Sequence, residues 1–182
     1  MHDVRPRVRV EYSEDMGVAI LTSVEDYLRT SYDPDREYVD GRIVERNLGE
    51  KPHSRIQRKL IVYLDQRSNE YGIEVFPEQR VQVSPTRFRI PDVTVVQLPQ
   101  SQEPIITTPP LLCIEILSKE DTMEDMQERI DDYLLFGVPY VWIISPRHRK
   151  AYVATREGIL EAKTVLATDS ASIHVPLTAL FD

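Results

Sequence analysis

Apolar residues recur at helical spacing in two long segments of the chain. In residues 53–71 an apolar side chain returns every four positions, which predicts an amphipathic helix that ends at Gly72. Residues 121–136 show spacings of three and four and predict a second helix that ends at Gly137. The apolar positions are Ile56, Leu60 and Leu64 in the first segment and Met123, Met126, Ile130 and Leu134 in the second.

Shorter runs rich in Val, Ile, Phe and Tyr predict strands, and the turn residues between them predict hairpins. Asp40-Gly41 separates two such runs and supplies the positive φ angles that a two-residue turn requires. The segments 73–83 and 88–98 flank residues 84–87, whose composition predicts a turn, so they are expected to pair as a second hairpin. A proline-rich stretch then excludes regular structure before the next strand.

Two almost wholly apolar runs, residues 111–117 and 140–145, have the composition of strands that are covered on both faces of a sheet. The second predicted helix lies between them. Strand, helix and strand in this order form a βαβ unit, whose two strands lie parallel with a right-handed crossover. A final hairpin is expected in residues 150–163. The pattern predicts an α/β fold with a central mixed β-sheet flanked by helices.

The composition narrows this picture. A chain of 182 residues buries one core but is short for two, so we expect a single domain over residues 1–182 in which residues 1–20 form a weakly ordered arm. The 30 acidic and 22 basic residues give a net charge of -8, which disfavours non-specific attraction to nucleic acid. One cysteine, Cys113, excludes an intramolecular disulfide. No apolar run reaches the length of a membrane span, and a cytoplasmic protein is expected.

Two acidic residues stand in apolar strands. An ionised Glu115 in the middle of residues 111–117 would cost several kcal/mol unless it is paired or bound to a metal. Asp92 follows Pro91 at the start of an equally apolar run. Because Mg²⁺ usually takes one or two carboxylates, the candidate ligands of Mg²⁺ or Mn²⁺ are Asp92, Glu115 and the backbone carbonyl of Ile116. A metal held there would activate a water molecule for phosphodiester hydrolysis.

Each of these residues also has a purely structural explanation. Glu115 would be satisfied by a buried ion pair with Arg129, and Asp92 by backbone amides at a strand end. His53, at the start of the first long helix, is more often a capping or packing residue than a catalyst. Asp125 lies four residues before Arg129, the spacing of an exposed ion pair on a helix.

Pro91-Asp92, followed by Glu115-Ile116-Leu117, resembles the signature of the PD-(D/E)xK nuclease superfamily. The resemblance covers roughly residues 22–182 and extends to a bacterial family of restriction-endonuclease-like proteins. It implies a restriction-endonuclease-like fold, cleavage of DNA with Mg²⁺ held by the Asp and the Glu, and a homodimer. The further segments that carry it are residues 37–41, His53, 89–93, Ser118, Tyr133, 136–138 and 140–143.

The chain departs from the superfamily pattern at the lysine that follows the Glu by two residues, where it has Leu117. In the resembling family a lysine four residues before Tyr133 takes that place, and this chain has Arg129 there. Arginine keeps the charge and can clamp a phosphate, but it cannot act as a general base. Two accessory acids are candidates, Glu37 by its family position and Glu78 because it interrupts a strand-like run.

Basic residues on or near the first long helix and beside the Asp92 strand are candidate DNA contacts, although a solvated surface explains them as well. They are Arg55, Arg58, Lys59, Arg67, Arg87 and Arg89. Lys119, in the loop after the Glu115 strand, could also reach the site. The sequence therefore predicts a Mg²⁺-dependent DNA endonuclease. The alternative is a catalytically inactive nuclease fold that binds nucleic acid or protein.

Overall fold

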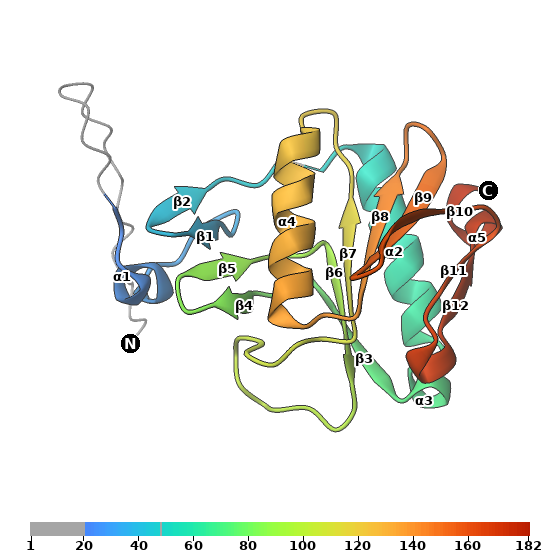
Figure 1. The fold of residues 1–182 in the computed structure, drawn as a ribbon, viewed down its shortest axis with the longest axis horizontal. Coiled ribbons are helices and arrows are strands. Elements are labelled where there is room, and N and C mark those ends of the chain that lie inside the picture. Colours follow the sequence, from blue (N-terminus) through green and yellow to red (C-terminus); the bar gives the residue numbers. More distant parts are fainter. Residues whose placement is uncertain (1–20, 48) are drawn as a thin grey trace, which may run out of the picture.

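The computed structural model describes residues 21–47 and 49–182, so the predicted arm of residues 1–20 lies outside the described residues. Its centre is a six-stranded sheet in the order β10-β9-β8-β7-β6-β3 (Figure 1). The strands β7 and β8 are parallel, and the other neighbours are antiparallel, which confirms the predicted mixed sheet. The strands are β3 (Ile73–Pro77), β6 (Val93–Gln97), β7 (Leu112–Ile116), β8 (Tyr140–Ser145), β9 (Lys150–Thr155) and β10 (Gly158–Ala162).

The predicted βαβ unit is present, with α4 (Met123–Phe136) between β7 and β8. Thr122 caps the helix by accepting a hydrogen bond from the Asp125 backbone, and the Asp125 side chain returns to Thr122. Gly137 ends α4 at φ 109, a conformation that favours glycine. Capping residues at both ends thus fix the length of α4 as the sequence indicated.

The first long helix is two helices, and the prediction of one continuous helix over residues 53–71 was wrong. The structure has α2 (Lys51–Asp65) and α3 (Ser68–Tyr71), with a break at Gln66 and Arg67. The apolar stripe ends at Leu64, so no buried side chain holds the next turn in line. Gly72 ends α3 in the left-handed region, as expected.

The second predicted hairpin forms, but it is divided between two sheets. Its outer parts pair as β3 and β6 in the central sheet, and its inner parts pair as β4 and β5 in a smaller sheet of order β2-β1-β5-β4. The division falls at Glu78, which has a φ of 49, and at Pro91-Asp92, where the chain bends. The small sheet contains β1 (Glu37–Val39), β2 (Arg42–Val44), β4 (Val81–Ser84) and β5 (Arg87–Arg89). Its β1–β2 hairpin turns at Asp40-Gly41, as predicted.

Apolar clusters cover both faces of the central sheet, with α2 on one face and α4 on the other (Figure 1). Alternate residues of β7 join opposite clusters, since Ile114 packs on the α2 side and Cys113 on the α4 side. Glu115 shares its face of β7 with Cys113 and therefore points towards α4. This alternation decides which helix can supply partners to the buried carboxylate.

The remaining elements lie at the two ends of the chain. α1 (Val24–Arg29) packs Tyr27 against Tyr38 and Phe88 of the small sheet. The C-terminal elements that follow the predicted hairpin of residues 150–163 join the cluster on the α2 side. They are β11 (Val165–Ala167), the 3-10 turn η1 (Ser170–Ser172), β12 (His174–Pro176) and α5 (Leu177–Phe181). Among the described residues, no helix is long and apolar enough to cross a membrane.

Candidate functional site

Asp92 lies at the bend before β6, where its carboxylate faces the end of β7. Its Oδ2 accepts a hydrogen bond of 2.7 Å from the Ile116 backbone N–H and lies 3.1 Å from Nε2 of His53. Its Oδ1 accepts a 3.0 Å bond from Nη2 of Arg46. The side chain is only 7% exposed, so these three donors fix both its position and its orientation. The strand-end amide bond considered from the sequence is thus present, alongside two cationic partners.

His53 sits in the first turn of α2, with 12% of its side chain exposed. Burial lowers the pKa of His53, but its hydrogen bond to Asp92 and the charge of that carboxylate outweigh burial and raise the pKa above 6.5. The imidazole therefore holds its proton to a higher pH than an unperturbed histidine does. His53 acts on the position and charge of Asp92, a role that neither capping nor core packing describes.

Glu115 is held by two residues of α4. Its Oε1 accepts a 2.6 Å hydrogen bond from the Tyr133 hydroxyl, and its Oε2 lies 3.4 Å from Nη1 of Arg129. Burial raises the pKa of Glu115 to about 7, although the Arg129 charge opposes this and the charges of Asp92 and Glu37 add to it. The buried ion pair considered from the sequence is present. The separation of 3.4 Å between the two charged groups is long for an ion pair, so Arg129 offsets only part of the cost of burying the Glu115 charge.

The two predicted ligands are brought together. Val93 of β6 pairs with Ile114 of β7 in an antiparallel register, and continuing that register by one residue sets Asp92 across from Glu115. The amide of Ile116, the residue after Glu115, donates directly to Asp92. The negative charge of Asp92 also contributes to the raised pKa of Glu115. The two carboxylate residues therefore lie across from each other near the carboxyl end of β7.

The number of carboxylates and their remaining lone pairs are compatible with a divalent cation. Within residues 21–47 and 49–182, no group of three or more His, Cys, Asp and Glu side chains could hold a metal ion. Two carboxylates are, however, the number that Mg²⁺ usually takes from a protein. A carboxylate can accept about four hydrogen bonds; Asp92 accepts from three donors and Glu115 from two. Both retain lone pairs for a cation.

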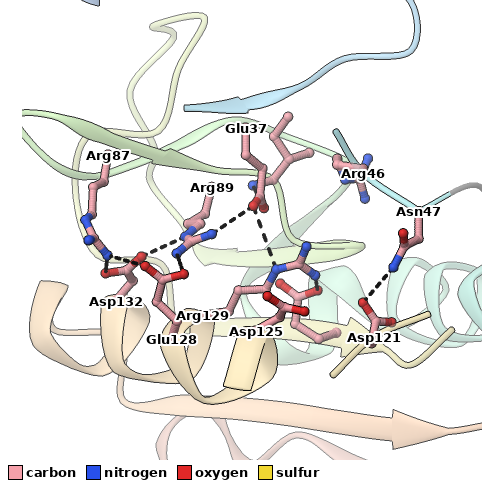
Figure 2. A network of polar contacts seen from close by, with 12 residues as sticks. Glu37, Arg46, Asn47, Arg87, Arg89, Asp121, Asp125, Glu128, Arg129 and Asp132 are labelled. Atoms are coloured by element: carbon pink, nitrogen blue, oxygen red, sulfur yellow. Dashed lines mark hydrogen bonds and ion pairs between the residues drawn. The ribbon is translucent and has the colours of Figure 1, made fainter. Parts of the chain in front are cut away.

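Glu37 lies behind Arg129 at the junction of the small sheet and α4 (Figure 2). It is fully buried, accepts a 2.9 Å bond from Nη1 of Arg89 and a 3.1 Å bond from the Ile90 amide, and lies 3.7 Å from Nε of Arg129. The guanidinium of Arg129 therefore has Glu37 near one edge and Glu115 near another. The geometry makes Glu37 an anchor for Arg129.

Arg87 and Arg89, two of the candidate DNA contacts, are engaged with acidic residues of the chain. Nε of Arg89 donates to Asp132 at 2.7 Å, and Nη1 of Arg87 donates to the same carboxylate at 2.9 Å and to Glu128 at 3.1 Å (Figure 2). Arg87 also pairs with Asp40 at 2.6 Å. These arginines join β5 to α4 and have no free charge for a phosphate.

Two other candidate DNA contacts, Lys59 and Arg67, each donate a hydrogen bond to a backbone carbonyl of the chain. Lys59 donates to the carbonyl of Leu180, so it fastens α5 to α2. Arg67 donates to the carbonyl of Tyr63 and stacks over that ring at 3.8 Å. Arg55 and Arg58 remain exposed on α2.

The remaining candidates lie near the site without entering it. Glu78 is half exposed in the turn between the two sheets, with its carboxylate 3.6 Å from Nη1 of Arg46. Its backbone N–H donates to the Asp92 carbonyl at 3.3 Å, and Gln57 donates to both that carbonyl and the Glu78 carboxylate, so Glu78 adjoins the site. Lys119 pairs with Glu50 at 2.7 Å on the surface. Asp125 caps α4 and has its shortest contacts with Thr122, which replaces the expected ion pair with Arg129. Leu117 packs beside the cluster on the α4 side and brings no charge.

Sequence reasoning missed two partners of the carboxylates. Arg46 follows β2 in a segment without periodicity, and no sequence feature connects it with Asp92, which lies 46 residues further along the chain. Tyr133 could have been assigned, because it lies four residues after Arg129 and therefore on the same face of α4. The hydroxyl of Tyr133 lies 2.6 Å from Glu115, closer than the guanidinium of Arg129.

The raised pKa of Glu115 predicts a specific pH dependence of stability. A carboxyl with a pKa of 4.5 in the unfolded chain and about 7 in the folded one binds more protons when folded between these pH values. The free energy of unfolding should therefore fall as pH rises through this window, by up to roughly 3 kcal/mol from this group. Glu115→Gln should remove that part of the decline. Urea unfolding at pH 5 and pH 8 in EDTA measures it, and parallel pH profiles for both proteins would contradict the assignment.

Comparison with known proteins adds three findings. A family model described as "Uma2: Putative restriction endonuclease" matches residues 24–180. A crystal structure of "a putative nuclease belonging to DUF820" from Anabaena variabilis ATCC 29413 is similar, with a TM-score of 0.77 and 20% identity over 86% of this chain and 96% of that one. No match was found among proteins of curated function. The structural likeness confirms the restriction-endonuclease-like fold predicted from the sequence.

Proposed function

The chain belongs to the Uma2 family of putative restriction endonucleases, and from that premise we propose that it hydrolyses DNA phosphodiester bonds with Mg²⁺ or Mn²⁺ held by Asp92 and Glu115. One observation carries the proposal. Two buried carboxylates meet at the end of β7, and one of them is so poorly compensated that its pKa is raised to about 7. A divalent cation would relieve this cost of burying charge.

Each neighbouring side chain has a role in this proposal. The Ile116 amide, His53 and Arg46 orient Asp92, and the Tyr133 hydroxyl orients Glu115. A bound divalent ion lowers the pKa of a water molecule and offsets the charge that develops on the phosphate. The carbonyl of Ile116 is retained as a candidate third ligand.

Arg129 is proposed to hold the scissile phosphate, because it lies at the edge of the site with 14% of its side chain exposed. Burial lowers the pKa of Arg129, but the negative charges of Glu115 and Glu37 outweigh burial, and the net pKa is raised. The guanidinium therefore stays protonated and cannot act as a general base. The base must therefore be another group, such as bulk water or the substrate phosphate. Glu37 contributes by fixing the position of Arg129.

The alternative function has an observation of its own. Arg46, His53 and Arg129 already supply positive charge to the two carboxylates, and Leu117 stands where the superfamily has its lysine. If these side chains already balance the charge of the two carboxylates, no metal ion is needed. Such a site suits a nuclease fold that binds nucleic acid or protein and has no cleavage activity. Measurements of metal binding and DNA cleavage by the native protein distinguish the two functions.

The test measures metal binding and cleavage by the native protein. Calorimetric titration with Mn²⁺ and Mg²⁺ should give binding at one site, and incubation with supercoiled plasmid and long genomic DNA should give nicked or linear products that EDTA prevents. Absence of metal binding would reject the nuclease proposal and favour the binding module. Metal binding without cleavage of any DNA would show that the site has lost its activity.

Arg129→Lys tests whether the charge on α4 replaces the missing lysine. Lysine keeps the charge near Glu115 and Glu37 and can also exchange a proton, so any cleavage rate should rise about tenfold or more if proton transfer limits the native enzyme. The rate should be measured across pH 6 to 9, since a lysine that takes part would add a basic limb to the profile. An unchanged rate and profile would assign Arg129 a purely electrostatic role.

The predicted homodimer, the choice of DNA over RNA and the cytoplasmic location stay predictions. They follow from the resemblance and the composition.

A further inference from the structure

A cleft of about 620 Å³ opens beside the candidate metal centre. Three segments line it, residues 50–53 at the start of α2, 117–121 after β7 and 145–148 after β8. Because β7 and β8 are parallel, their carboxyl ends lie at one edge of the sheet, where α2 also begins (Figure 1). His53 lines the cleft and contacts Asp92 at 3.1 Å, so the cleft leads directly to the carboxylates.

The turn after β8 brings unpaired positive charge to this cleft. Arg147 lines it, is exposed, and has no hydrogen bond or ion pair with the described part of the chain. Its neighbours in the turn differ in this respect, since Arg149 pairs with Asp182 at 2.6 Å and Lys150 with Glu161 at 3.6 Å. An uncommitted guanidinium can bind a phosphate without first breaking an internal contact.

Two more side chains in the cleft can contact an anion. The buried hydroxyl of Ser145 lies 3.0 Å from Nδ1 of His148, which leaves Nε2 as the ring nitrogen available to a ligand. Lys119 pairs with Glu50, but both side chains are more than half exposed. An ion pair of that kind is worth about 0–1 kcal/mol, so a phosphate can compete for the ammonium group.

The two acidic residues of the cleft are both engaged in contacts within the chain. Glu50 faces Lys119, and Asp121 accepts hydrogen bonds from the Ser118 amide at 2.6 Å and from Asn47 at 3.0 Å. Asp121 therefore serves to shape the loop after β7. Arg147 has no acidic partner in the cleft.

A second cleft, of about 460 Å³, adjoins Arg129 on the side of the small sheet, and its lining is net acidic. Two of its three arginines, Arg89 and Arg129, are held by buried carboxylates. Acidic residues outnumber the arginines there, so a polyanion would be repelled. They are Glu45, Glu120, Asp121, Asp125 and Glu128.

We propose that the 620 Å³ cleft seats the DNA backbone on one side of the scissile phosphate, with Arg147, His148 and Lys119 as its phosphate contacts. This inference rests on the proposed nuclease function, and it identifies the side of the metal centre along which the DNA substrate lies. It also explains how a chain with a net charge of -8 can hold a polyanion, because the contacts are local and adjoin the metal centre.

The test compares Arg147→Glu with Arg156→Glu. Arg156 is an exposed arginine in the turn between β9 and β10, at the opposite end of β9 from the cleft, and its contact with the Leu134 carbonyl is a long 3.4 Å. The probe is a fluorescent 30-base-pair duplex, titrated by anisotropy in EDTA and again in Ca²⁺. Arg147→Glu should weaken binding about tenfold or more and lower the salt slope by about one, and Arg156→Glu should change binding by less than about twofold.

The outcomes separate this inference from the proposed function. If the native protein binds the duplex and Arg147→Glu binds it equally well, the cleft assignment is overturned and the nuclease proposal stands. If the native protein neither binds nor cleaves DNA, both fail. Arg147→Lys, which keeps the charge, should bind within a few-fold of the native protein, and a loss as large as that of Arg147→Glu would assign Arg147 to local structure instead.

Discussion

Asp92→Asn is expected to eliminate measurable Mn²⁺ binding and to lower any DNA cleavage rate at least about 100-fold. The substitution keeps the shape of the side chain, and its amide oxygen can still accept the bond from the Ile116 N–H. What it removes is the negative charge and one carboxylate oxygen. With two protein carboxylates at the site, a neutral side chain at Asp92 takes away half of the anionic charge that would hold the ion.

The matched control is Asp131→Asn. Asp131 lies on the exposed face of α4 and accepts a 2.9 Å bond from Gln127, so the same chemical change occurs away from the site. It should leave metal binding and cleavage within about twofold of native. Calorimetry with Mn²⁺ and plasmid cleavage should be run on all three proteins side by side. If Asp92→Asn binds Mn²⁺ as tightly as the native protein, the carboxylate is not a ligand and the proposed centre is wrong.

Folding stability provides the control for misfolding of Asp92→Asn. The variant loses the anion that faces Arg46 and His53, so its unfolding free energy should fall by about 1–3 kcal/mol. A cooperative urea transition with that shift shows that the protein is folded. If the variant is folded, the loss of metal binding is caused by the change at the site and not by misfolding.

The sequence predicted the elements that carry the carboxylates because their signals are local. The apolar run around Glu115 could only be a strand covered on both faces, and in β7 all five residues are buried. Helix α4 was predicted from its periodicity and its terminal glycine, and the structure agrees with both. Because the order is strand, helix and strand, β7 and β8 are parallel, and their carboxyl ends lie at the same edge of the sheet.

The contacts between distant segments could not be predicted in this way. Glu37 and Arg89 lie 52 residues apart and meet only because β1 and β5 are neighbours in the small sheet. That sheet exists because the predicted second hairpin bends at Glu78 and at Pro91-Asp92, a local backbone change that hydrophobic periodicity does not record. The bend also places β5 in the small sheet, from which Arg87 and Arg89 reach the carboxylate of Asp132.

Arg89→Leu is expected to destabilise the fold by about 3–5 kcal/mol, the largest effect on stability among the arginines. The side chain of Arg89 is 3% exposed and that of its partner Glu37 is 0% exposed, at a separation of 2.9 Å. Without the arginine, Glu37 keeps the bond from the Ile90 amide and a distant contact of 3.7 Å with Arg129. A buried carboxylate with so little compensation must either pay for desolvation or take up a proton.

Arg87→Leu supplies the comparison, because Arg87 pairs with the same Asp132 from a position where a quarter of its side chain is exposed to solvent. Water can replace its contacts, so the cost should be about 1 kcal/mol. The double variant Arg89→Leu with Glu37→Leu should recover part of the loss, since it leaves no unpaired charge in place of the pair. Urea unfolding at pH 7 measures all four proteins. Equal costs for Arg87→Leu and Arg89→Leu would show that burial does not decide the strength of this network.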